Sequence, residues 1–292
     1  MLRLAVARAM HGLTARVRCA SVETVDCPTY ESIGWGYSRH RRADPRIVRE
    51  LARLLGPPGD GEVVDIGAGT GNYAAALARL GYRVVAVEPS ATMRRQVREI
   101  PGVRWVAAIA ERLPLADGCA EGAACVIALH HFADVRTALT EMRRVVRGGP
   151  VVVFTFDPRV GQRFWFEDYF PELWDEAHQV FPPLEEVVRL VEEATGGDVE
   201  VFEFLLPHDL QDKFAAAGWR RPWIYLDDEV RAGISAFALA EQRVVGKGLE
   251  RLSRDLRSGA WHAKYHRILQ LEVFDAGYRF LKASPDVRLF SR

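Results

Sequence analysis

The sequence lacks three features that would each point to a particular kind of partner. No apolar run approaches the roughly 20 residues of a membrane-spanning helix. Lys and Arg together number 39, as do Asp and Glu, so no surplus of positive charge is available to hold a nucleic acid. The four cysteines, Cys19, Cys27, Cys119 and Cys125, do not have the spacing of a zinc site. We therefore expect no membrane, nucleic-acid or metal partner, and free thiols in a reducing cytoplasm.

Several sequence signatures of catalysis and phosphate binding are also missing. The chain has no GxSxG nucleophile elbow, no HExxH helix and no GK[ST] that would complete a P-loop. The dinucleotide pattern GxGxxG fails in both registers, because Asn72 and Ala74 stand where its last glycine would be. These absences exclude a P-loop and a dinucleotide-binding loop, so the glycine-rich loop of this chain must be interpreted from its own pattern.

The glycine-rich loop is the stretch around which the rest of the chain is organised. An apolar run over 63–66 leads into Gly67, Gly69 and Gly71, and a helical pattern over 73–80 follows. The order predicts a strand, a tight turn and a helix. Glycine admits positive φ and leaves bare backbone for a ligand, and the helix N-terminus presents N–H groups to it.

Two acidic residues accompany these glycines. Asp65 lies in the first apolar run, and Glu88 ends a second apolar run over 84–87. In a doubly wound sheet, an acid at the end of the second strand reaches both hydroxyls of a bound ribose. We therefore predict that Glu88 accepts hydrogen bonds from the ribose of an adenosine ligand.

Asp65 to Gly71 matches every fixed position of the pattern (D/E)xGxGxG, so the chain resembles the class I S-adenosylmethionine (SAM)-dependent methyltransferases, and within them the methyltransferase type 11-like small-molecule group. The resemblance covers about residues 30–156 and, weakly, 208–226 and 276–283. It implies an α/β fold with a Rossmann-like seven-stranded sheet, helices on both of its faces, and helical or aromatic insertions after strands five and six. It also implies SAM as cofactor and S-adenosyl-L-homocysteine as product.

The resemblance further implies which residues hold the cofactor. Ile109 stands where the family usually has an acid for the adenine amino group, so backbone N–H groups of Ala110 and Glu111 would take that role. In the segment before the core, Arg41 would pair with the SAM carboxylate, although Arg39 or Arg42 can replace it and a solvated basic linker is the alternative. The expected cofactor-binding residues are Asp65, Gly67, Ala68, Gly69, Gly71, Asn72, Glu88, Pro89, Met93, Ala110, Glu111, Leu129, Arg41 and Tyr37.

The acceptor side of the expected site begins with Leu129-His130-His131 at the end of the fourth strand. This end points into the same crevice as the glycine loop. His131 is the first choice of general base and His130 the second, with Asp157 and His208 behind them. A purely structural pair is the alternative, and an amine, thiol or phenolate acceptor needs only proximity.

An aromatic run over 164–174 follows strand five and has two interpretations. It forms a lid over an apolar substrate, or it is the small core of the insertion; we expect a mixture of both. The expected substrate-contacting residues are Tyr30, Phe156, Phe164, Trp165 and Tyr169.

The expected division of the chain follows from these features. Residues 1–28 form an Arg-rich leader, for which a transit peptide is an alternative. The remaining divisions are 29–156 for the SAM-binding core with its N-terminal cap, 157–207 for a substrate lid, 208–227 for the resumed core with strand six over 219–226, 228–275 for a helical insertion, and 276–292 for the closing strand and tail.

We therefore predict a cytoplasmic SAM-dependent methyltransferase that acts on a small, partly apolar metabolite, as a monomer or homodimer. One alternative is an enzyme of the same fold that uses SAM for another reaction. A second alternative is a non-catalytic SAM-binding protein.

Overall fold

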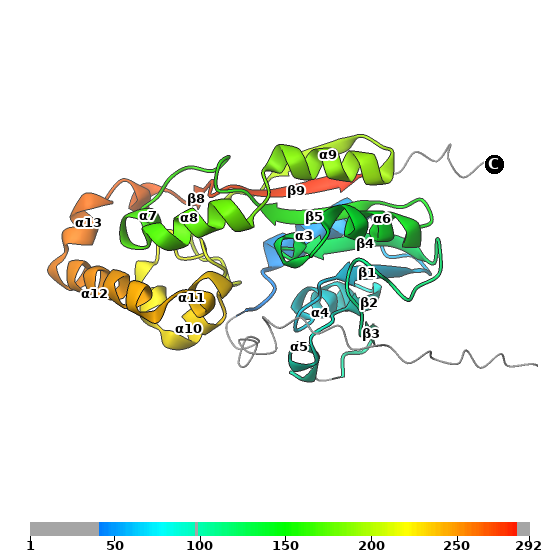
Figure 1. Cartoon of the computed structure of the whole chain (residues 1–292), viewed down its shortest axis with the longest axis horizontal. Coiled ribbons are helices and arrows are strands. Elements are labelled where there is room, and N and C mark those ends of the chain that lie inside the picture. The colour runs from blue at the N-terminus through cyan, green and yellow to red at the C-terminus, as the bar shows by residue number, and fades with distance from the viewer. Residues whose placement is uncertain (1–40, 97–98, 285–292) are drawn as a thin grey trace, which may run out of the picture.

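The computed structural model describes residues 41–96 and 99–284. Its centre is a seven-stranded sheet (Figure 1) with the order β3-β2-β1-β4-β5-β9-β6. The expected leader and the cap residues Tyr30 and Tyr37 lie outside the described residues. The strands are β1 (Glu62–Ile66), β2 (Arg83–Val87), β3 (Val103–Val106), β4 (Ala120–Val126), β5 (Val151–Phe156), β6 (Val199–Glu203) and β9 (Tyr278–Ala283).

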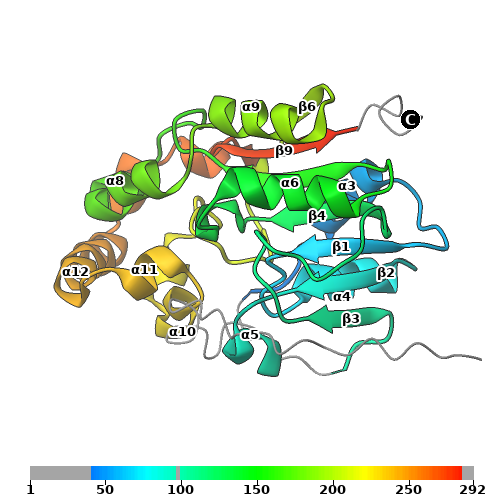
Figure 2. The same cartoon turned by 45° about the vertical axis from the view of Figure 1, so that its right-hand side comes forward.

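The direction of the strands fixes where ligands can bind. Strands β1 to β5 are mutually parallel, and β9 runs antiparallel between β5 and β6. Figure 2 shows the arrows of β1 and β4 pointing one way and that of β9 the other. The carboxyl ends of β1, β2 and β4 therefore meet at one edge of the sheet, where open α/β folds bind their ligands. The α/β, Rossmann-like fold expected from the sequence is confirmed.

Helices cover both faces of the sheet, each with its own apolar cluster. One face carries α3 (Pro45–Leu55) and α4 (Asn72–Arg79), and the other carries α6 (Val135–Val145) and α9 (Leu184–Thr195). Their first turns follow the sequence: Asp44 accepts a hydrogen bond from the Arg46 backbone N–H and caps α3, which starts with proline. The Ser90 side chain likewise accepts a hydrogen bond from the Met93 N–H and caps the short α5 (Ala91–Arg95).

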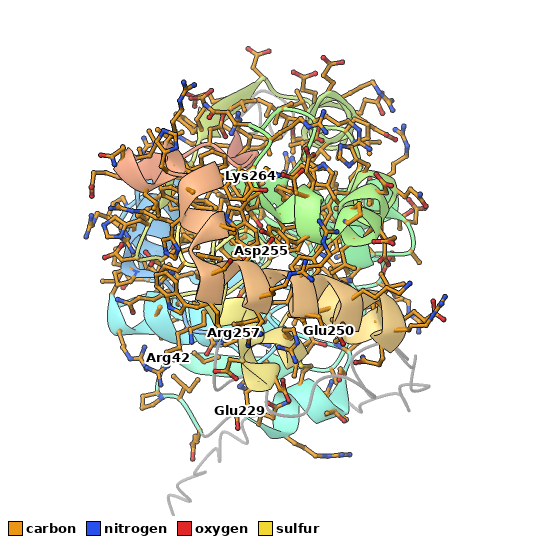
Figure 3. The ribbon with its side chains drawn as sticks, turned by 90° about the vertical axis from the view of Figure 1, so that its left-hand side faces the viewer. Arg42, Glu229, Glu250, Asp255, Arg257 and Lys264 are labelled. Atoms are coloured by element: carbon orange, nitrogen blue, oxygen red, sulfur yellow. The ribbon has the colours of Figure 1, made fainter. Side chains whose placement is uncertain are left out.

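The remaining chain forms a helical insertion beside the sheet, at the left of Figure 1. Its interior is aromatic, with Trp165, Tyr225, Phe237 and Trp261 almost fully buried. Figure 3 looks onto its outer face, where α12 presents Glu250 and Arg257. The helices are α7 (Phe166–Tyr169), α8 (Pro171–Val180), α10 (Asp228–Ala232), α11 (Ser235–Leu239), α12 (Gln242–Ser258) and α13 (Ala260–Lys264), and β7 (Leu206–Pro207) pairs with β8 (Val273–Phe274).

Two expectations about the second half of the sheet are wrong. Strand six was expected over 219–226, but Pro222–Leu226 is a 3-10 helix and the sixth strand is Val199–Glu203. The sequence also predicts a helix from His208 to Gly218, but the structure has a series of turns there. The physical reason is tertiary: β9 offers its second edge to residues 199–203, whereas Tyr225 turns inward and its hydroxyl bonds to the Gly218 N–H. The sequence predicts an extra strand over 199–206, within the segment 157–207, and the structure places residues 199–203 in the central sheet.

The length and apolar character of the helices decide whether any of them could span a membrane. Within residues 41–96 and 99–284, no helix combines the length and the apolar character that crossing a bilayer requires.

Candidate active site

The glycine loop after β1 adopts a backbone that only glycine takes without strain. Gly67, Gly69 and Gly71 have φ of 71°, 57° and 73°. A Cβ on Gly67 would lie 2.6 Å from the Ala128 Cβ, and one on Gly71 would lie 2.6 Å from the Trp105 ring. A Cβ on Gly69 would have only the Met93 methyl, at 3.4 Å, within 4 Å. Gly67 and Gly71 thus let the loop pack on its neighbours, while Gly69 leaves open space.

Glu88 fastens this loop to the end of β2. One carboxylate oxygen of Glu88 accepts the Gly69 N–H at 2.9 Å, and the other accepts the Ser90 N–H at 2.9 Å. The N–H groups of Gly67 and Ala68 both donate to the Val87 carbonyl, at 3.0 Å each. The Glu88 carboxylate is therefore buried and held in a fixed orientation at the end of β2.

Asp65, at the end of β1, is a buried carboxylate with an unsatisfied oxygen. Its Oδ2 atom has no hydrogen-bond partner, and the residue is only 2% exposed. Burial, and after it the charge of Glu88, raise the pKa of Asp65 to about 7, although the Ala74 backbone N–H acts to lower it. An orphaned acceptor beside a negative neighbour is suited to a ligand that brings N–H or O–H donors or positive charge.

The other expected cofactor residues divide into two groups. Met93, Ala110 and Leu129 are buried side chains at the same edge of the sheet, and Pro89 is half-buried next to them. Two polar side chains make contacts within the protein instead: Asn72 Nδ2 donates to the Arg41 carbonyl at 2.6 Å, and a Glu111 carboxylate oxygen accepts the Asp134 N–H at 3.2 Å.

Arg41 is held by Asp212 in a buried network. Its guanidinium pairs with both Asp212 oxygens, and the Tyr73 hydroxyl donates to the same carboxylate at 2.9 Å. Tyr73 stands on the first turn of α4, directly after the glycine loop. The structure thus gives Arg41 an internal carboxylate partner, which neither the expected pairing with the cofactor carboxylate nor the alternative of a solvated linker included.

An apolar hollow, which we term the acceptor cavity, lies beyond the carboxyl ends of β4 and β5. It is about 180 Å³ in volume and is walled by residues of the sheet, of α8 and α11, and of the turns between them. Its walls are mainly aromatic and aliphatic, with few polar groups. The lining residues include Ile127, His130, His131, Phe156, Phe164, Trp174, Ala177, Phe181, Phe214 and Arg41.

The two histidines stand at the inner end of the acceptor cavity, on the 3-10 turn Leu129–His131. Their ring centroids lie 3.8 Å apart, and the His130 ring lies 4.1 Å from that of Phe181. Burial and then the charge of Arg41 lower the pKa of His131 to about 4. Burial, His131 and Arg41 also lower the pKa of His130 well below its usual value. Both rings are therefore neutral near pH 7 and able to accept a proton.

The two reserve candidates for a base do not line the acceptor cavity. His208 lies beside β7 with its Nε2 atom 3.2 Å from Glu272. The Asp157 carboxylate accepts from the Leu184 N–H at 2.8 Å and from Arg159 at 2.9 Å. Their contacts account for both side chains as structural groups.

The structure separates the expected substrate residues. Phe156 and Phe164 line the acceptor cavity. Trp165 and Tyr169 do not: the Trp165 indole donates to the Trp219 carbonyl at 2.6 Å, and the Tyr169 hydroxyl donates to Asp255 at 2.8 Å. The aromatic run is thus partly wall and partly insertion core, the mixture that we expected.

Sequence reasoning missed several wall residues. Phe181 and Phe214 come from turns that carry no motif, and Ile127 from the end of β4. The only local signal was apolar character, which buried core residues share. No cluster of three or more potential metal ligands occurs in the described part of the chain.

The loop and its acids fit an adenosine-containing, positively charged cofactor. Gly69 leaves space where a Cβ would otherwise project, Glu88 is fixed as a bidentate acceptor, and Asp65 has an oxygen without a donor. The acceptor cavity adjoins this edge through the turn that carries Ala128 against Gly67 and His131 into the cavity.

Comparisons with known proteins indicate a methyltransferase. A family model described as a methyltransferase domain matches residues 64–154. A solved structure from Anabaena variabilis ATCC 29413, of a protein proposed to be a methyltransferase from an antibiotic biosynthesis pathway, has a TM-score of 0.82 and 49% identity, over 84% of this chain and 98% of that one.

Two more distant relatives extend the comparison. The ubiquinone/menaquinone biosynthesis C-methyltransferase UbiE of Rubrivivax gelatinosus is 34% identical over 35% of this chain, and the match spans only 41% of that protein. Phosphoethanolamine N-methyltransferase 2 of Haemonchus contortus, solved with S-adenosyl-L-methionine, shares the fold at 18% identity, with a TM-score of 0.51 over 89% of this chain and 56% of that one.

Proposed function

Because this chain belongs to the class I SAM-dependent methyltransferases, we propose that it methylates a small, mainly apolar metabolite bound in the acceptor cavity. The single observation that carries the choice of acceptor is the cavity itself, which adjoins the glycine loop through Ala128, packed against Gly67, and the turn Leu129–His131 that follows. A hollow lined by apolar side chains with a few polar groups is typical of a small-molecule site.

When bound, SAM would supply a methyl group on a sulfonium: the acceptor atom would bond to the methyl carbon in line as the carbon–sulfur bond breaks, and S-adenosyl-L-homocysteine would leave as the neutral thioether. The protein has three tasks in such a reaction: it binds the cofactor and the acceptor, aligns the acceptor atom with the methyl group, and excludes water from the site. We assign binding to the loop glycines, Glu88 and Asp65, whose unsatisfied oxygen suits a donor or a cation. Met93, Ala110 and Leu129 supply apolar contact for the adenine side.

We assign the acceptor side to the histidine turn and the aromatic walls. His131 lines the cavity as a neutral imidazole, so it is able to take a proton from the acceptor, and His130 supports it by ring contact. The low pKa makes His131 a weak base, which favours acceptors that lose their proton readily, such as a thiol or an acidic phenol. Phe156, Phe164 and Phe181 would hold the apolar body of the acceptor and keep water out.

Cofactor binding is tested with S-adenosylhomocysteine and calorimetry. Gly69→Arg should abolish binding, because the side chain would occupy the space beside Met93. Gly246→Arg is a matched control: this glycine lies in α12 with nothing within 4 Å of a built Cβ. Binding that survives Gly69→Arg, or that fails in the unaltered protein, contradicts the site.

The acceptor cavity is tested by filling it. Ala177→Trp on α8 should lower turnover of any acceptor found in a metabolite panel, while binding of S-adenosylhomocysteine stays within about twofold. The exposed Ala263, changed to Trp, is the control. Unchanged turnover in Ala177→Trp would rule out the cavity as the acceptor site.

The mass of the product distinguishes methyl transfer from the alternative, an enzyme of the same fold that catalyses another reaction. A gain of one CH₂ unit supports methyl transfer, and a product of unchanged mass supports a rearrangement on the same fold.

We place the reaction in the cytoplasm, in keeping with the free thiols of Cys119 and Cys125.

A further inference from the structure

Ile127, the residue that follows β4, has a backbone conformation that its side chain disfavours. Its φ is 49°, and among residues 41–96 and 99–284 no other residue except glycine has a positive φ. In this left-handed region Cβ crowds the next carbonyl oxygen, and a second branch at Cβ makes the crowding worse. Glycine or asparagine would make the same turn at lower cost.

The surrounding contacts hold Ile127 in place from both sides. Its N–H donates to the Phe154 carbonyl on β5 at 2.7 Å, which extends the β4–β5 pairing by one step. Immediately after it, Ala128 packs against Gly67 of the glycine loop, and the Ala128 carbonyl accepts the His131 N–H at 2.9 Å. The left-handed residue therefore makes the bend that sends Ala128 to the cofactor side and His131 to the acceptor side.

The bend explains the backbone but not the choice of isoleucine. The Ile127 side chain lines the acceptor cavity together with Phe156 and the two histidines. Strained residues that persist in a fold cluster at functional sites, where surrounding structure enforces them. A glycine would build the bend more cheaply and leave a gap in this wall.

We propose that Ile127 is a specificity-determining residue, whose side chain limits the bulk of the acceptor beside the histidine turn. The inference rests on the proposed function, since it assigns the cavity to the acceptor. It requires two separable effects: the backbone of residue 127 should favour glycine over alanine, and loss of the side chain should admit a larger ligand.

The first effect is measured by thermal unfolding of Ile127→Gly and Ile127→Ala. Both variants lose the part of the Ile127 side chain that lines the cavity, so the difference between their melting temperatures reports the backbone strain at residue 127. The glycine variant should melt a few degrees higher than the alanine variant, which reverses the usual order. Ala128→Gly is the matched control: its φ is −125°, so glycine there should lower the melting temperature. A glycine variant at 127 that melts below the alanine variant would remove the claim of strain.

The second effect is measured by calorimetry with phenol and 4-phenylphenol, in the presence of S-adenosylhomocysteine. Relative to phenol, 4-phenylphenol should gain about tenfold in affinity in both Ile127→Gly and Ile127→Ala. Ile127→Val, which keeps the branched wall, should change the ratio little. A ratio that stays within about twofold in all three variants, or an absence of binding of both phenols to every variant, overturns the proposal.

These outcomes are distinguishable from failure of the proposed function. If the unaltered protein does not bind S-adenosylhomocysteine, the assignment of the glycine loop to the cofactor fails. The ratio of phenol affinities can then be measured without S-adenosylhomocysteine, and it still tests the role of Ile127. If Ile127 only packs the core, its alanine variant will lose melting temperature with no change in that ratio.

Discussion

Replacing Asp65 by asparagine should stabilise the protein above neutral pH, because the Asp65 carboxylate is buried with an unsatisfied oxygen. The pKa of Asp65 is about 7 in the folded protein, against 3.8 in an unfolded chain. A raised pKa means that between these values the folded state holds a proton that the unfolded state has released. The free energy of unfolding then falls as the pH rises from about 4 to about 7.

The magnitude follows from the size of the shift. A difference of about 3 pKa units corresponds to about 4 kcal/mol at 1.36 kcal/mol per unit. Part of this destabilisation is already present at pH 5, because Asp65 is ionised in the unfolded chain at that pH. The asparagine side chain resembles the protonated acid and stays neutral, so Asp65→Asn should gain about 3 kcal/mol relative to the unaltered protein between pH 5 and pH 8.

Urea unfolding of both proteins at pH 5 and pH 8, without ligand, measures this difference. Other titrating groups cancel, since both proteins contain them. Asp60→Asn is the control, because Asp60 is exposed and the substitution removes the same charge. The reasoning fails if the Asp65→Asn gain is the same at both pH values, or if the variant becomes relatively less stable at pH 8.

Three further predictions concern the rest of the site. Gly71→Ala, with φ of 73° and a new Cβ 2.6 Å from Trp105, should cost about 1–3 kcal/mol in urea unfolding and weaken binding of S-adenosylhomocysteine; binding at full strength would contradict the geometry of the loop. The pKa of His131 is about 4, so kcat should show no inflection near pH 6.5, and an inflection that disappears in His131→Gln would refute this. Arg41→Met leaves the buried Asp212 without its cation and should cost about 3 kcal/mol in urea unfolding, whereas a loss below about 1 kcal/mol would show that the pair is solvated.

The first half of the fold could be predicted because its signals are local. Residues 63–71 combine β-branched residues, an acid and glycines, and the structure places a strand and a tight turn there. The helix Pro45–Leu55 has a capping acid and an initial proline, which specify its start without help from other segments. Each of these features depends on neighbours in the sequence.

The second half could be predicted only in part: the closing strand expected within 276–292 is present as Tyr278–Ala283, but other elements are defined by distant partners. Val199–Glu203 is largely exposed and forms a strand because β9 pairs with it. Residues 222–226 are mainly apolar and resemble a short strand in composition, yet Pro222–Leu226 packs as a 3-10 helix around Tyr225. Periodicity cannot separate the two cases.

The acceptor cavity was foreseen only in part for the same reason. Its wall residues Phe164, Phe181 and Phe214 come from three separate segments, which meet only when the insertion closes on the sheet. The glycine loop and Glu88, by contrast, belong to two adjacent strands and could be paired on sequence grounds.

The position of β9 has a consequence for how the protein is made. Strand β9 lies between β5 and β6, yet it is translated after the whole of residues 204–277. Until it emerges from the ribosome, β5 presents an open edge and β6 has no partner. The parallel strands β1 to β5 can assemble early, whereas the final two positions depend on contacts far apart in the sequence, which form slowly. A nascent chain that stalls within α12 would therefore expose the β5 edge and be prone to aggregation.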